Sequence, residues 1–400
     1  MKKKLLFGVL VMSLLLSACG NGNPEESRKD SEVSSETESQ VESESNSETE
    51  SQTESQTETE SEVVVEPEPV ITEIVVSAVG DCTLGHNQKQ GYAKSFDEYY
   101  DKFGADYFFQ NVRSVFEADD FTIVNLEGPL TNSDNIRTTK EWNHIGRPEY
   151  VKVLTGSSVE AVTLGNNHIM DYQKDGVADT IQNVTDAGLA YAIDSDWGHA
   201  LGTYEVKGIK IGFVSVNEYY DGTRVYKWLE DGHAKLREQG CDIVIAAMHW
   251  GGDKVHTLEK NQYVMGKWCI DTGFDLVIGC HPHVIQGIEE YKGKYIVYSM
   301  GNFCYGGNRN PAEKESMIFQ TKFTFVDGVL QPQTEGKVYP CRLSSVTNKN
   351  DYCPVILTGD EGQKVIDQLN GYSKEFGLFI HPDGSITTSE KEASTEKVTE

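Results

Sequence analysis

Runs of apolar, mostly β-branched residues alternate with amphipathic stretches along most of the chain. Several runs are nearly continuous in Val, Ile and Leu, which is typical of strands covered on both faces. Short runs of this kind, bounded by turn residues, predict strands rather than helices. The strands are expected at residues 71–79, 121–126, 159–164, 209–216, 243–248, 276–279 and 296–299.

The stretches between these runs have the apolar spacing of helices. Helices are expected at residues 106–117, 175–187, 227–239, 260–272 and 360–369. Residues 317–338, with the turn Asp327–Gly328, predict a late hairpin. Strands that alternate with helices indicate an α/β domain.

The first residues have the pattern of a secretory leader. Lys2, Lys3 and Lys4 precede an uncharged, mostly apolar run over residues 5–16. A membrane-spanning helix needs about 20 apolar residues, so this run is too short to cross a bilayer.

The end of the leader, Leu16-Ser17-Ala18-Cys19-Gly20, resembles a bacterial lipobox. The resemblance implies that a signal peptide of residues 1–18 is removed and that Cys19 is acylated. The mature chain would then be held by lipid on the extracytoplasmic face of the bacterial cell membrane. The alternative is an ordinary secretory signal with an incidental cysteine.

Residues 19–70 are predicted to form a disordered acidic tether. From Gly20 to Val70 the chain has 16 acidic and 2 basic residues, a net charge of −14 out of −28 for the whole chain. Such a stretch has too little apolar surface to fold, and its like charges extend it. We expect a spacer; a ligand-binding role for the acidic run is the alternative. The remainder is expected to comprise a main domain at 71–345, an extension with a helix at 346–383 and a disordered tail at 384–400.

The charge and the cysteines exclude some classes of protein. Nucleic acid is not an expected partner, because a duplex binder needs a basic patch and no Lys/Arg cluster lies outside the leader. The cysteines have no repeating spacing, so neither a disulfide framework nor a zinc ribbon is predicted. Cys241, Cys269 and Cys280 fall in apolar segments and are expected to be buried thiols, whereas Cys341 and Cys353 could pair.

Side chains that bind metals lie within about three residues of the ends of several expected strands. They are Asp81, Glu127, Asn167, His168, His249 and His281. Ligands of open α/β sheets bind outside the carboxyl ends of the strands, so these groups are expected to share one pocket. The alternative for any single histidine is a hydrogen-bonded loop residue.

The residue types also agree with a metal site. Imidazole, carboxylate and amide donors suit Mn, Fe or Zn, and no thiolate is required. In His281-Pro282-His283 the two imidazoles stand at i and i+2, which in an extended loop point the same way. Both are therefore expected to face one bimetallic centre.

Six short strings, in order along the chain, resemble the bacterial CapA-type capsule or poly-γ-glutamate synthesis proteins. They are Val79-Gly80-Asp81, Asn125-Leu126-Glu127-Gly128-Pro129, Asn166-Asn167-His168 with Asp171-Tyr172, His249-Trp250-Gly251, His281-Pro282-His283-Val284-Ile285-Gln286 and Tyr298-Ser299-Met300-Gly301-Asn302-Phe303. The resemblance covers about residues 75–303. Such proteins are in turn similar to calcineurin-like metallophosphoesterases, which implies a four-layer sandwich of two β-sheets flanked by helices.

The resemblance also implies a site with two divalent metal ions. Asp81 and His283 would bind the first ion, and Glu127 would bridge the two ions. Asn167, His249 and His281 would bind the second ion.

Two further residues would act beside the ions. His168 would sit over the leaving group as an acid or charge stabiliser. Asp171 could orient an imidazole, with a helix N-cap as its alternative role.

The chain departs from the phosphoesterase pattern at two places. Thr83 stands where the first strand of that pattern has a histidine, and His86 is only a guess for its replacement. Glu127 takes the place of a bridging aspartate. The chain also departs from the CapA-type family around residues 252–256, where that family is expected to have an acidic residue and a tyrosine after His-Trp-Gly.

Further residues are candidates for substrate contacts. Arg137, Arg147 and Arg224 could bind a phosphate or carboxylate in a bidentate manner, or form surface salt bridges. Asn302 could line the same pocket, or be a turn residue.

Three functions are compatible with these patterns. The first is a metal-dependent hydrolase of a phosphoester in an envelope polymer or its precursor. The second is a capsule or poly-γ-glutamate assembly factor that works with membrane synthase subunits and binds the polymer. The third is a scaffold whose site has decayed, favoured by Thr83 alone.

Overall fold

Two large β-sheets form the centre of the protein. The structure is a computed structural model that describes residues 67–218, 222–332 and 335–388. The larger, nine-stranded sheet has the order β17 (Val355–Ile356), β16 (Glu335–Arg342), β14 (Glu315–Val326), β1 (Ile71–Cys82), β3 (Phe121–Leu126), β5 (Ala161–Thr163), β6 (Ala190–Ser195) and β7 (Gly198–Ala200), with β15 (Val329–Leu330) paired to β14. The six-stranded sheet has the order β12 (Ile288–Tyr291), β13 (Lys294–Val297), β11 (Leu276–Cys280), β10 (Ile243–His249), β9 (Ile209–Asn217) and β8 (Gly202–Val206).

The inner faces of both sheets contribute to one hydrophobic core. Alternate residues along each strand point inward, as the two-residue period of a strand requires. Ile74 and Ile123 from the larger sheet share this core with Phe213 and Ile245 from the smaller one. The sheets therefore pack face to face.

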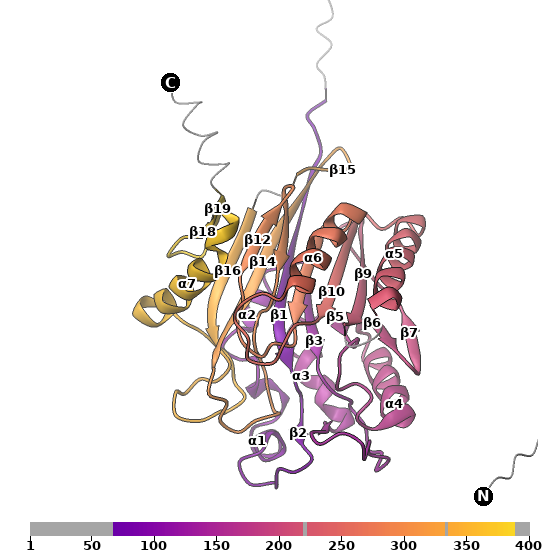
Figure 1. The fold of residues 1–400 in the computed structure, drawn as a ribbon, viewed down its shortest axis with the longest axis vertical. Helices are drawn as coiled ribbons and strands as arrows, with labels where there is room; N and C mark the ends of the chain where they lie inside the picture. The colour runs from indigo at the N-terminus through magenta and orange to yellow at the C-terminus, as the bar shows by residue number, and fades with distance from the viewer. Residues whose placement is uncertain (1–66, 219–221, 333–334, 389–400) are drawn as a thin grey trace, which may run out of the picture. The chain divides into compact units, whose positions relative to one another are not determined.

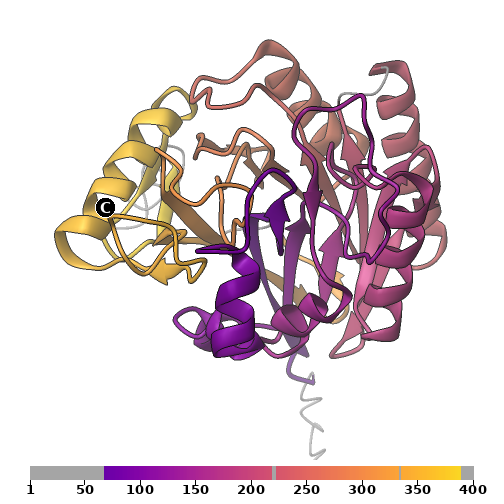
Figure 2. The same cartoon turned by 90° about the horizontal axis from the view of Figure 1, so that it is seen from below.

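Helices cover the outer faces of both sheets (Figure 1). On the larger sheet lie α1 (Phe96–Phe103), α2 (Arg113–Phe116), α3 (Val151–Thr155) and α4 (Gln173–Asp186). On the smaller sheet lie α5 (Gly222–Glu238) and α6 (Lys260–Thr272). Figure 2 shows the helices around the outside of the strands from below. No helix among the described residues is long and apolar enough to cross a membrane.

The C-terminal extension packs onto the same core. It comprises α7 (Gly359–Ser373) and a hairpin of β18 (Leu378–Ile380) and β19 (Ile386–Thr388). Buried apolar side chains from all three, including Ile366 and Ile386, belong to the shared core. The tail predicted from residue 384 therefore begins too early, because β19 pairs with β18 and residues 384–388 are part of the fold.

Several expected elements were misplaced or missed. β3 and α6 have the bounds expected from the sequence, whereas the helix expected at 106–117 is only a short turn and α2. Phe108 stacks on Phe96 while Phe109 packs against Phe303, so these neighbouring rings serve different contacts. α1, β6 and β8 were not predicted.

All cysteines in the described part of the chain are buried free thiols. Cys241, Cys269 and Cys280 are buried, as expected. The suggested pairing of Cys341 with Cys353 is wrong, since each packs separately into the core as a reduced side chain.

The predicted ligands follow strands that are parallel neighbours. Parallel pairing places the carboxyl ends of these strands at one edge of each sheet. β1, β3 and β5 are parallel neighbours in the larger sheet. β9, β10 and β11 are parallel neighbours in the smaller sheet. Since the sheets face each other, residues that follow these strands can meet.

Gly80 lies where the backbone of β1 comes close to the backbone of the segment that follows β13, and a larger residue would not fit there. A Cβ atom at Gly80 would lie 1.9 Å from the backbone oxygen of Gly301, a distance that no real contact allows. Asp81 N–H donates to that same oxygen at 2.9 Å. The close approach of two backbones thus fixes Asp81 at the edge of the sheet.

Replacing Gly80 should destabilise the protein by forcing these backbones apart. For Gly80→Ala we expect a loss of about 1–3 kcal/mol in the free energy of unfolding, measured by urea denaturation. Gly371→Ala is the matched control, because it lies in α7 with nothing within 4 Å of the added Cβ. The control should be neutral or slightly stabilising; equal effects in both variants would contradict the account.

Candidate functional site

The predicted ligand residues converge in one buried cluster between the ends of the two sheets. Asp81 lies in β1 and Glu127 follows β3 directly. His249 is the last residue of β10, and His281 follows β11. These four side chains are 0–2% exposed. Residues far apart in the sequence therefore form one dry site.

His249 is at the centre of the first group of donors. Its Nε2 lies 3.2 Å from Asn167 Oδ1 and 3.1 Å from His281 Nδ1. Glu127 Oε1 lies 3.8 Å from the same nitrogen. Ligands that bind one ion at roughly 2.0–2.2 Å stand about 3–3.5 Å apart. This group therefore has nearly the spacing of a coordination shell.

Asp81 and His283 form the second group of donors. His283 Nδ1 lies 3.3 Å from Asp81 Oδ2, and its Nε2 lies 3.7 Å from Glu127 Oε1. Asn302 Oδ1 lies 2.9 Å from His283 Nδ1, so Asn302 does line the cluster. Glu127 Oε1 thus stands between the two groups, as a bridging ligand would.

Glu127 has one satisfied and one unsatisfied oxygen. Thr83 Oγ1 donates to its Oε2 at 3.0 Å. Oε1 is buried and has no hydrogen-bond partner among the described residues. A buried carboxylate oxygen without a partner is costly and requires an explanation, such as a bound ion or a proton.

The suggestion that His86 replaces the missing first-strand histidine is wrong. His86 Nδ1 lies 2.6 Å from Asp97 Oδ2, in an ion pair outside the cluster. Thr83 occupies the position of that histidine and contacts Glu127 through its hydroxyl group.

The backbone of the His-Pro-His segment is unusual. His281 has a φ of 99° and His283 a φ of 57°. The segment is therefore not the extended loop expected from the sequence, although both imidazoles reach the cluster. Positive φ at such residues costs about 1–3 kcal/mol each and persists where the surroundings impose it, commonly at functional sites.

Burial and charge set the protonation of the imidazoles. Burial and the neighbouring His281 hold the pKa of His249 well below its usual value. Burial and His283 lower the pKa of His281 to about 4. Although burial opposes its protonation, the carboxylates of Glu127 and Asp81 raise the pKa of His283 to about 10. His249 and His281 are thus neutral at pH 7, whereas the buried Glu127–His283 pair retains protons, because burial also raises the pKa of Glu127 to about 8.

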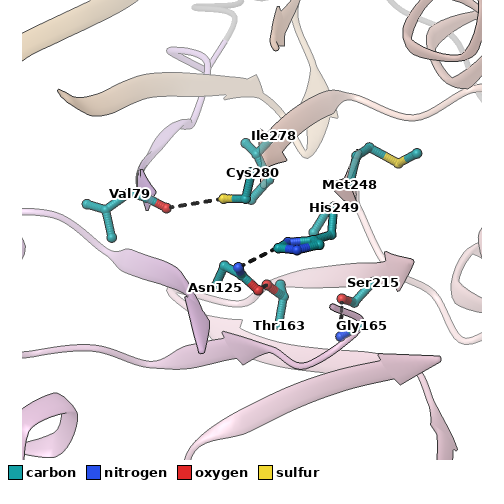
Figure 3. A pocket seen from close by; sticks show the side chains of 10 residues that line it. Val79, Asn125, Thr163, Gly165, Ser215, Met248, His249, Ile278 and Cys280 are labelled. Atoms are coloured by element: carbon teal, nitrogen blue, oxygen red, sulfur yellow. Dashed lines mark hydrogen bonds between the residues drawn. The ribbon is translucent and has the colours of Figure 1, made fainter. Parts of the chain in front are cut away.

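Asn125 joins the two sheets beneath this cluster, and sequence reasoning missed it. Its Nδ2 donates to Asp81 Oδ1 at 2.7 Å. The same Nδ2 lies 3.3 Å from His249 Nδ1, as Figure 3 shows. A cavity of about 10 Å³ adjoins it, lined also by Thr163 and Ser215. Such a volume has room for about one water molecule.

His168 and Asp171 form a dyad at the edge of the cluster. His168 Nδ1 lies 2.5 Å from Asp171 Oδ2, so the carboxylate orients the imidazole. The alternative role for Asp171, as a helix N-cap, is wrong because Tyr172 is the N-cap of α4. His144 stacks on His168 with ring centroids 3.8 Å apart.

Lys140 was missed because it lies in a long loop without periodicity. Its Nζ donates to Asp171 Oδ1 at 2.8 Å and to the backbone oxygen of Asn167 at 2.9 Å. His144, His168 and Asp171 are near enough to one another to hold an ion. The ammonium group of Lys140 already supplies the positive charge there.

The predicted arginines do not join the cluster as anion ligands. Arg147 pairs with Asp101 at 2.6 Å, and Arg224 pairs with Asp194 at 2.8 Å. Arg147 and Arg224 thus form salt bridges, which was the alternative to anion binding. Arg137 approaches the dyad through its backbone, whose N–H donates to the backbone oxygen of Asp171 at 2.8 Å.

A cavity of about 410 Å³ opens beside the cluster. Its wall includes His168, His283 and Asn302. Trp142, 54% exposed, lies at this cavity too. Asp253 also lines it. The departure stated for residues 252–256 is therefore wrong for the acidic residue, which is present as Asp253, and right for the tyrosine. The cavity gives a substrate-sized molecule access to the candidate site.

A family model places the chain among known proteins. The model described as bacterial capsule synthesis protein PGA_cap matches residues 75–306. The chain belongs to this capsule synthesis family. The matched residues include every member of the buried cluster, from Asp81 to Asn302.

Curated relatives agree with this membership. The PGA biosynthesis protein CapA of Bacillus subtilis (strain 168) is 30% identical over 246 residues, which are 57% of this chain and 62% of that protein. The capsule biosynthesis protein CapA of Bacillus anthracis is 24% identical over 254 residues, 58% of this chain and 60% of that protein. The match thus spans about three fifths of the length of each relative.

Solved structures offer only a weak likeness. A hypothetical protein from Thermus thermophilus has a TM-score of 0.41 and 15% identity, with 67% of this chain and 99% of that chain covered.

In this member of the capsule synthesis family, the Lys140–Asp171 pair should be important for stability. For Lys140→Met we expect a loss of about 3–5 kcal/mol in the free energy of unfolding, because the fully buried Asp171 would lose its counter-charge. Lys227→Met, which breaks an exposed pair with Asp231, should leave the free energy of unfolding nearly unchanged. Urea denaturation of both variants measures the difference; similar losses would contradict the assignment.

Proposed function

We propose that this protein is a membrane-anchored, extracytoplasmic factor of capsule synthesis whose buried cluster holds divalent metal ions and hydrolyses a phosphoester. The polymer would be poly-γ-glutamate or a related envelope polymer, and the substrate the polymer or its precursor. The single observation that carries the proposal is Glu127 Oε1, a buried carboxylate oxygen that lies between two groups of metal-type donors and has no hydrogen-bond donor in the described part of the chain.

The donor set fits Mn, Fe or Zn. His249, His281 and Asn167 would hold one ion, Asp81 and His283 the other, with Glu127 shared. Neutral imidazoles with depressed pKa values keep their lone pairs available at pH 7. Bound divalent ions would polarise a phosphoryl oxygen and lower the pKa of water.

The chain's own residues would position and protonate the substrate. His168 lines the cavity and is held by Asp171, so it could deliver a proton from Nε2 to a leaving oxygen. Lys140 would keep Asp171 ionised and in place. Burial would exclude bulk water, which strengthens every charge interaction in the site.

The layered architecture supports a relationship with metallophosphoesterases. Two facing sheets, flanked by helices, deliver carboxylate, amide and imidazole donors from successive strand ends to one place. This arrangement is one reason to propose the four-layer sandwich that the motif resemblance implies.

The location of the protein is proposed from its N-terminal sequence. Cys19 and the acidic tether lie outside the described residues. Acylation of Cys19 would attach the chain to the outer face of the cell membrane, with the tether as spacer. Membrane synthase subunits would be its partners there, and nucleic acid would not.

A second candidate function is a non-catalytic, polymer-binding scaffold of a membrane synthase. Thr83 favours it, because a threonine in place of the first-strand histidine leaves the Asp81–His283 group with fewer donors. The curated relatives are named for polymer biosynthesis rather than for hydrolysis.

Removing two imidazoles should abolish metal binding and cleavage together. We expect His249→Ala combined with His281→Ala to weaken Mn²⁺ binding more than about 100-fold, since losing only an outer partner of a ligand costs about 10–100-fold. Mn-dependent cleavage of a phosphodiester should fall to background. His381→Ala, in the β18–β19 hairpin, is the control. Unchanged metal content and unchanged activity in the double variant would contradict the proposed metal-dependent hydrolase activity.

Complementation of a deletion strain distinguishes a required hydrolase activity from a non-catalytic scaffold role. Deleting the gene should abolish surface polymer in either case. If chemistry is required, the double variant should fail to restore polymer while His381→Ala restores it. Restoration by the double variant would favour the scaffold.

Metal binding should release protons at pH 7. His283 has a pKa of about 10 in the metal-free protein and must lose its proton to become a ligand. Calorimetric titrations with Mn²⁺ in buffers of different ionisation enthalpy should show release of about one proton or more, and affinity should rise as pH increases from 6 to 9. An enthalpy that does not depend on the buffer would contradict the assignment of His283.

A further inference from the structure

Asp253 contacts the side of His281 that faces away from the donor cluster. Its Oδ1 lies 3.1 Å from His281 Nε2. The other ring nitrogen of His281, Nδ1, lies 3.1 Å from His249 Nε2. The imidazole of His281 is therefore held between a carboxylate on one side and the candidate metal position on the other.

The loop that carries Asp253 is tied to the His-Pro-His segment. Lys254 N–H donates to the backbone oxygen of Pro282 at 2.8 Å. Gln286 Nε2 donates to the backbone oxygen of Val255 at 2.7 Å. These bonds fix the position of Asp253 independently of its own contact with His281.

An ionised carboxylate only accepts hydrogen bonds, so its neighbour Nε2 must carry the proton. Nδ1 then keeps its lone pair, which is the form that a metal ligand needs. We infer that Asp253 is a positioning residue that fixes the tautomer and orientation of His281 for metal binding. This inference rests on the proposed metal site, and it assigns a role to a loop that the motif comparison had left without one.

Besides contacting His281, the side chain of Asp253 lines the cavity beside the cluster. Its side chain is 66% exposed and lines the 410 Å³ cavity with Glu313. Removing Asp253 therefore also removes a negative charge from the cavity wall. Glu313→Ala removes the same charge from the same wall, and no described hydrogen bond or ion pair joins Glu313 to a candidate metal ligand. It is the matched control.

The test is a titration of metal-free protein, residues 20–400, with Mn²⁺. Asp253→Ala should weaken binding about 10–100-fold, the usual effect of losing an outer-shell partner. Glu313→Ala should change it less than about two-fold, and Asp253→Asn should recover part of the affinity because its amide oxygen still accepts from Nε2–H. Equal affinities for wild type and Asp253→Ala, or an equal loss in Glu313→Ala, would overturn the inference.

A second measurement does not depend on metal. Long-range ¹H–¹⁵N spectra of ¹⁵N-histidine-labelled, metal-free protein should show His281 as the Nε2–H tautomer in wild type, with that preference lost in Asp253→Ala. If wild type binds no Mn²⁺ but shows this difference, the positioning role stands and the metal function fails. If wild type binds Mn²⁺ and the tautomer is the same in both proteins, the positioning role fails alone.

Discussion

The burial of the Glu127 carboxylate is the constraint on which the rest of the site depends. One oxygen accepts a hydrogen bond from the Thr83 hydroxyl group, and the other is buried from solvent and has no hydrogen-bond partner among the residues that the structure describes. A charged group in such a place must be neutralised by a proton or a cation. Side chains that could bind such a cation surround the unsatisfied oxygen. Imidazole, amide and carboxylate donors lie on both sides of it.

The fold produces this cluster through strand direction and close backbone contact. Parallel strands in each sheet end at one edge, and the facing sheets bring the two edges together. The contact of Gly80 with Gly301 places Asp81 beside Asn302, and the two residues form an isolated β-bridge. His281 and His283 adopt positive φ on the opposite side. The strain of that segment and the tight glycine contact indicate that the geometry of the site is imposed by the fold.

Much of this arrangement could be predicted from the sequence, and the limits have physical causes. Continuous β-branched runs identified β3, β10 and β11, and metal-type residues after them identified most of the cluster. Periodicity does not predict irregular segments or two-residue strands, so Lys140 in the loop after β3 and His144 in the short strand β4 (His144–Ile145) were missed. Asn125, inside β3, was missed because its position predicts only a strand residue.

Long-range pairing explains the remaining errors. The hairpin at the end of the chain depends on contacts between β18, β19 and the shared core, which composition does not reveal. Asp253 reaches His281 only because its loop is bonded to Pro282. Arg147 and Arg224 were candidates for anion binding or for surface salt bridges. Each forms an ion pair with a nearby carboxylate.

The most direct test of the account is a crystal structure grown with Mn²⁺ and measured at a wavelength where manganese scatters anomalously. The account predicts an anomalous peak beside Glu127 Oε1, within bonding distance of His249 Nε2 and His281 Nδ1. A fully occupied manganese ion elsewhere, with none at Glu127, or the absence of any bound ion at millimolar Mn²⁺, would contradict it.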